Sequence, residues 1–305
     1  MRKSIPIAAG LLLMSLLSAG CTQEERNVEP NPTVMPETRQ NAAKNDQETI
    51  EAVSTSPNVQ KITFHSESLN REMHFNIYLP IGYDESQKYP VLYMYHGYGS
   101  NEDAWMPDLG IDQAADELLT EGKVNPLIIV SPEINNSYGF NSSSEGNYSD
   151  YIIKDIIKYV DSHFSTDARR ESRYIGGLSM GGWAALYNAF AHPELFSKVG
   201  GHSPAVWMNN WSDTGGLKDW IYPTEEIRKQ RDPLLLAETA DLQELAVYLD
   251  CGDEDGYKFY EGSEALYKKL SIHNVKAEYH LSKGGHDGEY WKSHMRDYLL
   301  FYSGN

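Results

Sequence analysis

Strand-like and helix-like segments alternate along this 305-residue chain from about residue 60 to the C-terminus, and this alternation restricts the fold more than any other feature. Apolar side chains recur at every second residue over Met73–Leu79, which indicates a strand with one buried face. Val91–Tyr95 is apolar throughout, as is typical of a strand covered on both sides. Strands are predicted over Gln60–Phe64, Arg71–Leu79, Val91–Tyr95, Leu127–Val130, Tyr174–Gly176, Phe196–Gly200, Leu245–Leu249 and Lys276–Leu281, and helices over Ile152–Val160, Gly182–Ala191, Glu261–Ile272 and Tyr290–Tyr302. The pattern predicts an α/β fold, a mainly parallel sheet with helices on both faces.

One motif in this pattern carries chemistry. Gly177–Gly181 reads Gly-Leu-Ser-Met-Gly, follows a predicted short strand and precedes a predicted helix. In a G-x-S-x-G turn the glycines allow a strand-to-helix turn too tight for side chains, and the turn exposes the serine hydroxyl. The helix N-terminus behind it offers free N–H groups for a developing oxyanion. Ser179 is therefore the candidate nucleophile.

A nucleophilic serine needs a histidine base and an acid that orients the base. In this kind of fold the chain order is serine, acid, histidine, which favours a histidine near the C-terminus. His286 lies in the Lys-Gly-Gly-His loop after a predicted strand and is the candidate base. The acid is expected after the strand at Leu245–Leu249, where spacing leaves three alternatives open: Asp250, Asp253 and Asp255.

Three segments together resemble the esterase D family of α/β-hydrolases, which includes feruloyl and acetyl-xylan esterases, S-formylglutathione hydrolase and the antigen 85 acyltransferases. The segments are Tyr95-His96-Gly97-Tyr98-Gly99, Gly177-Leu178-Ser179-Met180-Gly181-Gly182, and Cys251-Gly252-Asp253-Glu254-Asp255 followed by Gly284-Gly285-His286-Asp287 and Trp291. The likeness runs from about Ile62 to the C-terminus and is strongest to feruloyl-esterase-like members. Val206–Thr239 departs from the family pattern.

The resemblance implies an α/β-hydrolase fold and assigns roles to particular residues. It selects Asp255 as the acid, and it implies oxyanion donors at the backbone N–H groups of Tyr98 and Met180. It places His96 in the oxyanion loop and not among the bases.

The function implied is that of a serine carboxylic ester hydrolase that forms an acyl-enzyme and needs no metal or organic cofactor. The expected substrate is an ester of the feruloyl or acetyl type, on a plant polysaccharide or a related alcohol. Two alternatives stay open: an acyltransferase of the antigen 85 type, and a non-catalytic lipoprotein that binds carbohydrate.

Aromatic residues in the unaligned stretch are candidate substrate contacts. Trp207 and Trp211 would lie over the sheet edge near Ser179 and could stack on a sugar or an aromatic acyl group. The alternative is that they pack within a small core of their own.

The N-terminal region is expected to lie outside the folded domain. Residues 1–20 have a basic start, a short apolar run and small residues before Cys21, the pattern of a lipoprotein signal peptide. Cys21 is then lipidated, and residues 21–58, which contain four prolines and no aromatic residue, form a disordered tether. The catalytic domain spans residues 59–305, anchored to the bacterial envelope on its extracytoplasmic side, with no other contact to the membrane.

Charge and cysteine content narrow the partners. With 26 Lys and Arg against 44 Asp and Glu, the net charge is −18, which argues against nucleic-acid binding. Cys251 is the only cysteine besides Cys21, so with a lipid on Cys21 no internal disulfide can form, and Cys251 is expected to be small and buried. The oligomeric state is not predicted.

Overall fold

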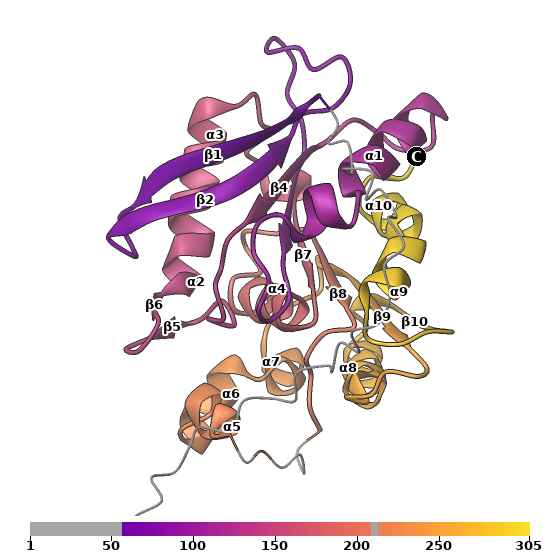
Figure 1. Cartoon of the computed structure of the whole chain (residues 1–305). Helices are drawn as coiled ribbons and strands as arrows, with labels where there is room; N and C mark the ends of the chain where they lie inside the picture. Colours follow the sequence, from indigo (N-terminus) through magenta and orange to yellow (C-terminus); the bar gives the residue numbers. More distant parts are fainter. Residues whose placement is uncertain (1–56, 209–212, 214) are drawn as a thin grey trace, which may run out of the picture. The chain divides into compact units, whose positions relative to one another are not determined.

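The computed structural model describes residues 57–208, 213 and 215–305, and an eight-stranded sheet runs through them (Figure 1). The strand order is β1-β2-β4-β3-β7-β8-β9-β10, and every neighbouring pair from β4 to β10 is parallel. β2 is antiparallel to both of its neighbours. The strands are β1 (Val59–Ser66), β2 (Arg71–Tyr78), β3 (Val91–Tyr95), β4 (Ile128–Pro132), β7 (Arg173–Leu178), β8 (Lys198–His202), β9 (Ala246–Gly252) and β10 (Lys276–Ser282); β5 (Asn141–Ser142) and β6 (Gly146–Asn147) form a separate small hairpin.

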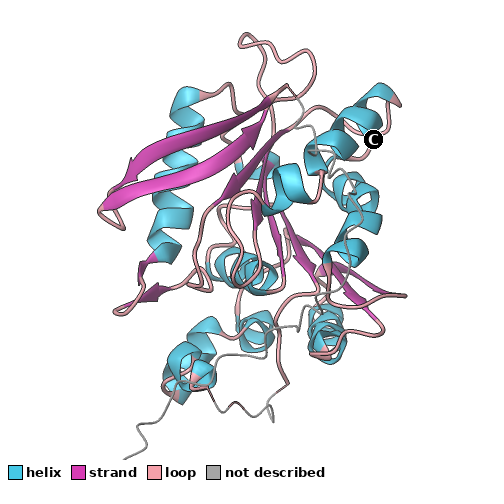
Figure 2. Ribbon diagram, in the orientation of Figure 1, coloured by secondary structure: helices cyan, strands magenta, loops and turns pink. Residues whose placement is uncertain are grey.

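Helices cover both faces of this sheet (Figure 2). The α-helices are α1 (Ile111–Thr120), α2 (Tyr148–Asp150), α3 (Ile157–His163), α4 (Met180–Ala191), α5 (Leu217–Ile221), α6 (Glu225–Arg231), α7 (Pro233–Thr239), α8 (Phe259–Ile272), α9 (Gly288–Ser293) and α10 (Met295–Ser303). Short π- or 3-10-helical turns are η1 (Ala104–Asp108), η2 (Tyr151–Ile156) and η3 (Arg170–Ser172). The prediction of an α/β fold with a mainly parallel sheet is confirmed.

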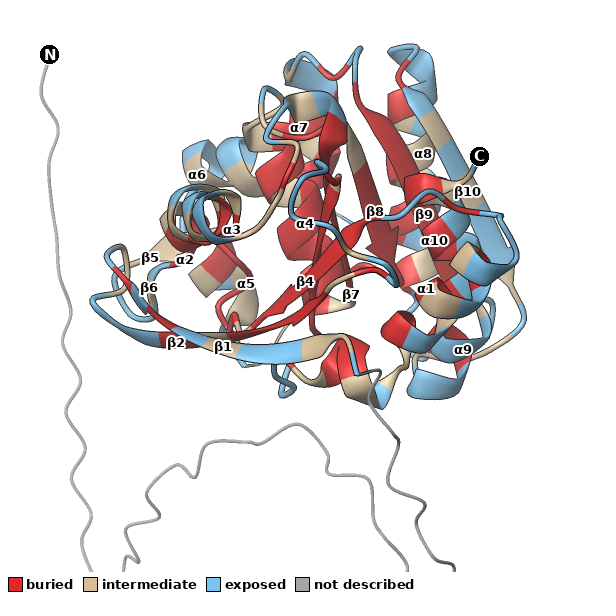
Figure 3. Ribbon diagram, turned by 90° about the horizontal axis from the view of Figure 1, so that it is seen from above, coloured by how far each residue is buried: buried red, intermediate tan, exposed pale blue. Residues whose placement is uncertain are grey.

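Two apolar cores explain why the central strands are apolar at every position. In β3, Val91, Tyr93 and Tyr95 face the core formed with α3, α4, α7 and α8. Leu92 and Met94 face the other core, formed with α1, α9 and α10. Successive side chains of a strand point to opposite faces, so a strand covered on both sides is apolar throughout. Figure 3 shows the central strands buried and the outer faces of the helices exposed.

Several predicted elements differ from the observed ones. The strands predicted at Phe196–Gly200 and Leu245–Leu249 each continue past their apolar runs, to His202 and Gly252. Glycine and polar residues do not give a strand signal, yet they extend the ladder here because the neighbouring strands supply backbone partners. The last helix was expected to be continuous over Tyr290–Tyr302, but it divides at His294 into α9 and α10. The predicted helices do not include α1, α2, α5, α6 or α7.

The described residues belong to one compact unit. None of its helices combines the length and the apolar character that crossing a bilayer requires. The predicted signal peptide (residues 1–20), the lipidation site Cys21 and the tether up to residue 56 lie outside the described residues. The predicted start of the domain at residue 59 coincides with the first residue of β1 and stays a prediction.

Candidate active site

Ser179 lies in a tight turn between β7 and α4. Its backbone has φ 53° and ψ −116°, an unfavourable conformation for a residue with a side chain. Three backbone hydrogen bonds hold it there: its N–H donates to the His202 carbonyl at 2.9 Å, and its carbonyl accepts from Trp183 N at 3.0 Å and Ala205 N at 2.9 Å. The turn therefore presents the hydroxyl at the carboxyl edge of the sheet, as the motif predicts.

The glycines around Ser179 are required by the closeness of the backbone. A Cβ atom at Gly177 would lie 2.5 Å from the Gly181 carbonyl group, and a Cβ at Gly181 would overlap the Tyr95 carbonyl. Neither obstacle is a flexible side chain, so the turn could accept a methyl group only by moving the backbone.

Gly177→Ala is expected to destabilise the protein by about 3 kcal/mol, because steric overlap with backbone is among the strongest effects of a single substitution. For a domain of this size that lowers Tm by about 6–12 °C. Gly256→Ala is the matched control, since a Cβ at Gly256 meets no atom within 4 Å. Thermal unfolding of both variants, followed by circular dichroism, checks the expectation; equal Tm values would contradict it.

His286 links Ser179 to an acidic residue. It lies in the loop between β10 and α9, with its side chain 11% exposed. Its Nε2 is 2.9 Å from Ser179 Oγ, and its Nδ1 is 2.8 Å from Asp255 Oδ2. The carboxylate accepts a hydrogen bond from Nδ1–H, so the ring proton stays on Nδ1 and Nε2 is free to accept the serine proton. The three residues predicted from sequence thus form one hydrogen-bonded chain.

The Asp255 carboxylate is buried and well supplied with donors. Besides His286, it accepts hydrogen bonds from the Cys251 thiol at 3.3 Å and from Tyr257 N at 2.8 Å. Burial by itself raises the pKa of Asp255, but the hydrogen bond and charge of His286, with the other two donors, bring that pKa below its usual value. The carboxylate is therefore ionised whenever the pH is above about 4. Cys251 is buried, as expected, and its thiol also contacts the candidate acid.

The two alternative acids lie elsewhere. Asp250 is fully buried within β9, where its carboxylate contacts His202 Nδ1 at 2.8 Å and accepts from the Tyr298 hydroxyl at 2.9 Å. Asp253 is exposed and accepts from Gly284 N at 3.2 Å. Geometry therefore joins Asp255 to His286, a choice that spacing alone left open.

The predicted oxyanion donors flank Ser179. Met180 is the first residue of α4 and directly follows Ser179. Tyr98 lies in the loop after β3, and β3 pairs in parallel with β7 so that Tyr95 is opposite Gly177. A Cβ at Gly97 would lie 3.6 Å from Ser179 Cβ, which places the loop that carries Tyr98 directly against the serine. Neither the Tyr98 N–H nor the Met180 N–H donates a hydrogen bond to another described residue. Their role as oxyanion donors stays a prediction.

The side chain of His96 supports the loop that carries Tyr98 through hydrogen bonds to the backbone. Its ring is fully buried, with Nδ1 2.8 Å from the Gly97 carbonyl and Nε2 3.0 Å from the N–H of Ile134. Nε2 also lies 3.2 Å from Glu133 Oε1, so the ring joins the Gly97 carbonyl to the segment at Glu133 and Ile134. His96 thus orients the loop and makes no contact with Ser179 in the structure.

Trp207 lies beside the candidate site and is half-buried. Its ring contacts Phe259 edge-on at 5.7 Å and Tyr138 at 6.0 Å. Phe259 in turn packs edge-on against His286 at 5.3 Å. Trp207 therefore belongs to the wall around the histidine, and its role in binding substrate stays a prediction. Trp211, the second predicted contact, lies outside the described residues.

Sequence reasoning missed Tyr257. Its side chain is 60% exposed, and its ring stands edge-on to His286 at 5.0 Å. Tyr98 is 52% exposed and lies near Tyr257, because both side chains are close enough to Tyr138 to affect the pKa of its hydroxyl. Burial is the main cause of the rise in that pKa, and Tyr98 and Tyr257 add to it. Tyr98 and Tyr257 together form an exposed aromatic rim. The signal in the sequence is that Tyr257 follows the candidate acid Asp255 by two residues.

In the part of the chain that the structure describes, no three His, Cys, Asp or Glu side chains gather in a way that could hold a metal ion. The expectation of a mechanism without metal or cofactor stays a prediction.

Comparison with known proteins gives a consistent result. Residues 66–302 match the family model Esterase, described as "Putative esterase". An "Endo-1,4-beta-xylanase/feruloyl esterase" of Xylanibacter ruminicola is 29% identical over 77% of this chain, and the match covers 30% of that longer protein. An "Acetyl esterase" of Caldicellulosiruptor saccharolyticus is 22% identical over 78% of this chain and 95% of its own length. A ferulic acid esterase of Anaeromyces mucronatus, solved with ferulic acid, is 26% identical, with a TM-score of 0.62 over 85% of this chain and 92% of its own. The structural neighbours have the α/β-hydrolase fold.

Proposed function

Because this chain belongs to the esterase family, we propose that it is a serine carboxylic ester hydrolase that acts through Ser179, His286 and Asp255. The observation that carries the proposal is the hydrogen-bonded chain from Ser179 Oγ through both ring nitrogens of His286 to the buried Asp255 carboxylate. A serine placed in a strained turn, with a base and an orienting acid, is the arrangement that acyl transfer requires.

In the first step, Ser179 Oγ attacks the ester carbonyl carbon while His286 Nε2 takes the hydroxyl proton. The Asp255 carboxylate keeps the imidazole in the required tautomer and stabilises the imidazolium that forms. The carbonyl oxygen, now negative, accepts from the backbone N–H groups of Tyr98 and Met180, each worth about 3–4 kcal/mol in the transition state by precedent. The imidazolium then protonates the leaving alcohol oxygen as the carbon–oxygen bond breaks, and an acyl-serine remains.

In the second step, His286 takes a proton from water, and the resulting hydroxide attacks the acyl carbon. The proton returns to Ser179 Oγ as the carboxylic acid leaves. No group outside this chain and its substrates takes part in the proton balance.

The proposed substrate is a feruloyl or acetyl ester of a plant polysaccharide. It is supported by the names of the related proteins and by the exposed aromatic rim of Tyr98 and Tyr257, which suits a planar acyl group or a sugar ring. The proposal includes export and attachment to the cell envelope through a lipid on Cys21, supported by the signal-like pattern of residues 1–21.

The test uses the full chain with feruloylated and acetylated xylo-oligosaccharides, and measures the acid released. Labelling with a fluorophosphonate, followed by mass spectrometry, locates the reactive serine. The proposal is supported if the chain releases ferulate or acetate, and if this activity is lost once the fluorophosphonate has reacted with Ser179. A chain that hydrolyses neither these esters nor 4-nitrophenyl acetate would contradict it.

A prediction about products separates hydrolysis from acyl transfer, the alternative of the antigen 85 type. With 4-nitrophenyl acetate and excess xylitol, free acetate is expected to account for nearly all the ester consumed, because Ser179 is only half-buried and water is far more concentrated than the sugar alcohol. Chromatography of the products checks this. Acetyl-xylitol as the main product would assign the chain to the acyltransferases.

A further inference from the structure

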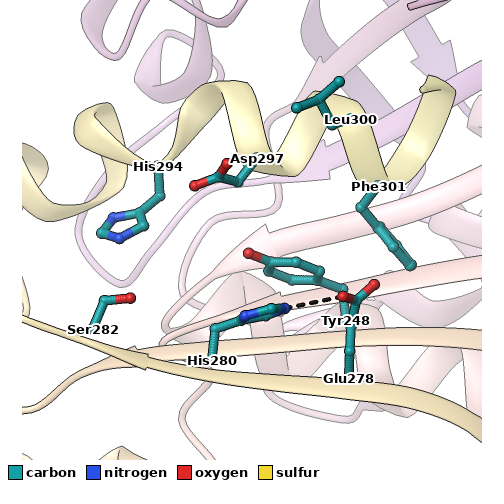
Figure 4. A pocket seen from close by; sticks show the side chains of 8 residues that line it. All are labelled: Tyr248, Glu278, His280, Ser282, His294, Asp297, Leu300 and Phe301. Carbon is teal, nitrogen blue, oxygen red and sulfur yellow. Dashed lines mark hydrogen bonds and ion pairs between the residues drawn. The ribbon is translucent and has the colours of Figure 1, made fainter. Parts of the chain in front are cut away.

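A cavity that Ser179 does not line lies between β10 and α10, with Tyr248 of β9 and His294, which precedes α10, also in its wall (Figure 4). Its volume is about 420 Å³, within the range of about 300–1,000 Å³ typical of small-molecule sites. Six polar side chains line it: Tyr248, Glu278, His280, Ser282, His294 and Asp297. Leu300 and Phe301 complete the wall with apolar atoms.

The Tyr248 hydroxyl is aimed into this cavity without a partner. Tyr248 is only 5% exposed, and its hydroxyl makes no hydrogen bond with any described residue. Figure 4 shows the hydroxyl pointing into the space between β10 and α10. A hydroxyl that faces a cavity and makes no hydrogen bond with a described residue is available to donate to a ligand. Burial, with the carboxylates of Asp250, Asp297 and Glu278 nearby, raises the pKa of Tyr248, so the phenol keeps its proton and can donate.

Acceptors without partners lie opposite this donor. The Asp297 carboxylate forms no hydrogen bond or ion pair with a described residue, and neither does the Ser282 hydroxyl. His280 and Glu278, by contrast, already pair with each other at 3.0 Å. The cavity thus offers a free donor and free acceptors to a single ligand.

Charge and ring packing narrow the ligand class. Two carboxylates and no Lys or Arg line the cavity, and the whole chain is strongly acidic, so anions are repelled. An organic cation would favour an open aromatic face. The ring of Tyr248 is instead covered by His280, stacked at 4.9 Å, and by Phe301 at 5.2 Å. Hydroxyl groups of a neutral sugar suit the lining, because each of them donates and accepts.

We propose that this cavity binds a neutral sugar unit of a carbohydrate chain, with ring hydroxyls donating to Asp297 and accepting from Tyr248. Leu300 and Phe301 contact the apolar C–H face of the ring. The site needs no ester and no Ser179, so it stands independently of the proposed hydrolysis. Ser282 and His294 flank the segment that carries His286, so a sugar bound here would lie beside the chain segment that supplies the candidate base.

The test is isothermal titration calorimetry of the full chain with unesterified xylohexaose and cellohexaose. Tyr248→Phe removes only the hydroxyl and is expected to weaken binding about three- to tenfold, as the loss of one hydrogen bond does. Asp297→Ala is expected to weaken it at least as much. Glu261→Gln, an exposed acid on α8 outside the cavity, is the matched control and is expected to bind like the wild type. Hydrolysis of 4-nitrophenyl acetate, measured in parallel, is expected to be unchanged in all three variants.

Three results would overturn the inference. The first is no binding of either oligosaccharide by the wild type. The second is binding unchanged in both cavity variants but lost in Trp207→Ala, which would place the sugar at the candidate active site. The third is binding of spermidine that depends on Asp297 while no sugar binds, which would make the cavity a cation site. Loss of esterase activity with sugar binding intact would instead count against the proposed function alone.

Discussion

Replacing Ser179 by alanine is expected to lower kcat for ester hydrolysis by about 10⁵- to 10⁶-fold, the size of effect known for the nucleophile of a serine hydrolase. The substitution removes the Ser179 oxygen, which lies 2.9 Å from His286 Nε2. It leaves the turn intact, because the hydrogen bonds that hold residue 179 all come from its backbone. The folded protein should therefore lose turnover and keep its stability.

The measurement is the initial rate of 4-nitrophenyl acetate hydrolysis, with thermal unfolding to show that each protein is folded. Ser271→Ala is the matched control, since this serine is exposed on α8 and its hydroxyl donates to the Tyr267 carbonyl of the same helix. If Ser179→Ala retained the wild-type rate, Ser179 would not be the nucleophile. A chain that binds carbohydrate without turnover would then become the better description.

Asp255→Asn is expected to lower kcat by about 10⁴-fold, with little change in KM. The asparagine amide can donate to His286 Nδ1, which favours the tautomer with the proton on Nε2, where it can no longer accept from Ser179. The carboxylate also stabilises the imidazolium, an effect that a neutral amide lacks. Because the pKa of Asp255 is lowered in the folded protein, its ionised form stabilises the fold above the unfolded pKa of about 3.9, and this contribution is lost as the pH falls.

Asp250→Asn is the matched control, and it should have the opposite profile. Asp250 and His202 are both fully buried and contact each other at 2.8 Å. Disturbing one member of a buried pair typically costs about 3–5 kcal/mol of stability. The folded fraction should keep most of its activity, because Asp250 makes no contact with His286. Rates and Tm values of both variants decide the matter: an inactive Asp250→Asn beside a nearly normal Asp255→Asn would overturn the assignment.

Local chemistry made part of the site predictable. The Gly177–Gly181 pattern indicates the turn around Ser179 from sequence alone, although part of the need for glycine comes from the distant Tyr95 carbonyl. The apolar runs of β3 and β4 likewise follow from burial on both faces. Elements whose signal depends on distant packing were missed or misplaced. β8 continues to His202 because β7 and β9 pair with it there, and the last helix divides at His294.

The sequence by itself determined the α/β class, the nucleophile turn and the loop that holds the histidine, because these follow from hydrophobic periodicity and from glycine sterics over short stretches. Spacing left the acid open among three aspartates and the family resemblance selected Asp255, but only the tertiary structure shows its contact with His286, since that contact joins residues 31 apart and the link to Ser179 joins residues 107 apart. It also turned Asp250 inward to His202 and left the Tyr248 hydroxyl facing a cavity. Spacing along a chain does not specify direction in space, and the direction of a side chain is set by the packing of segments that are distant in sequence.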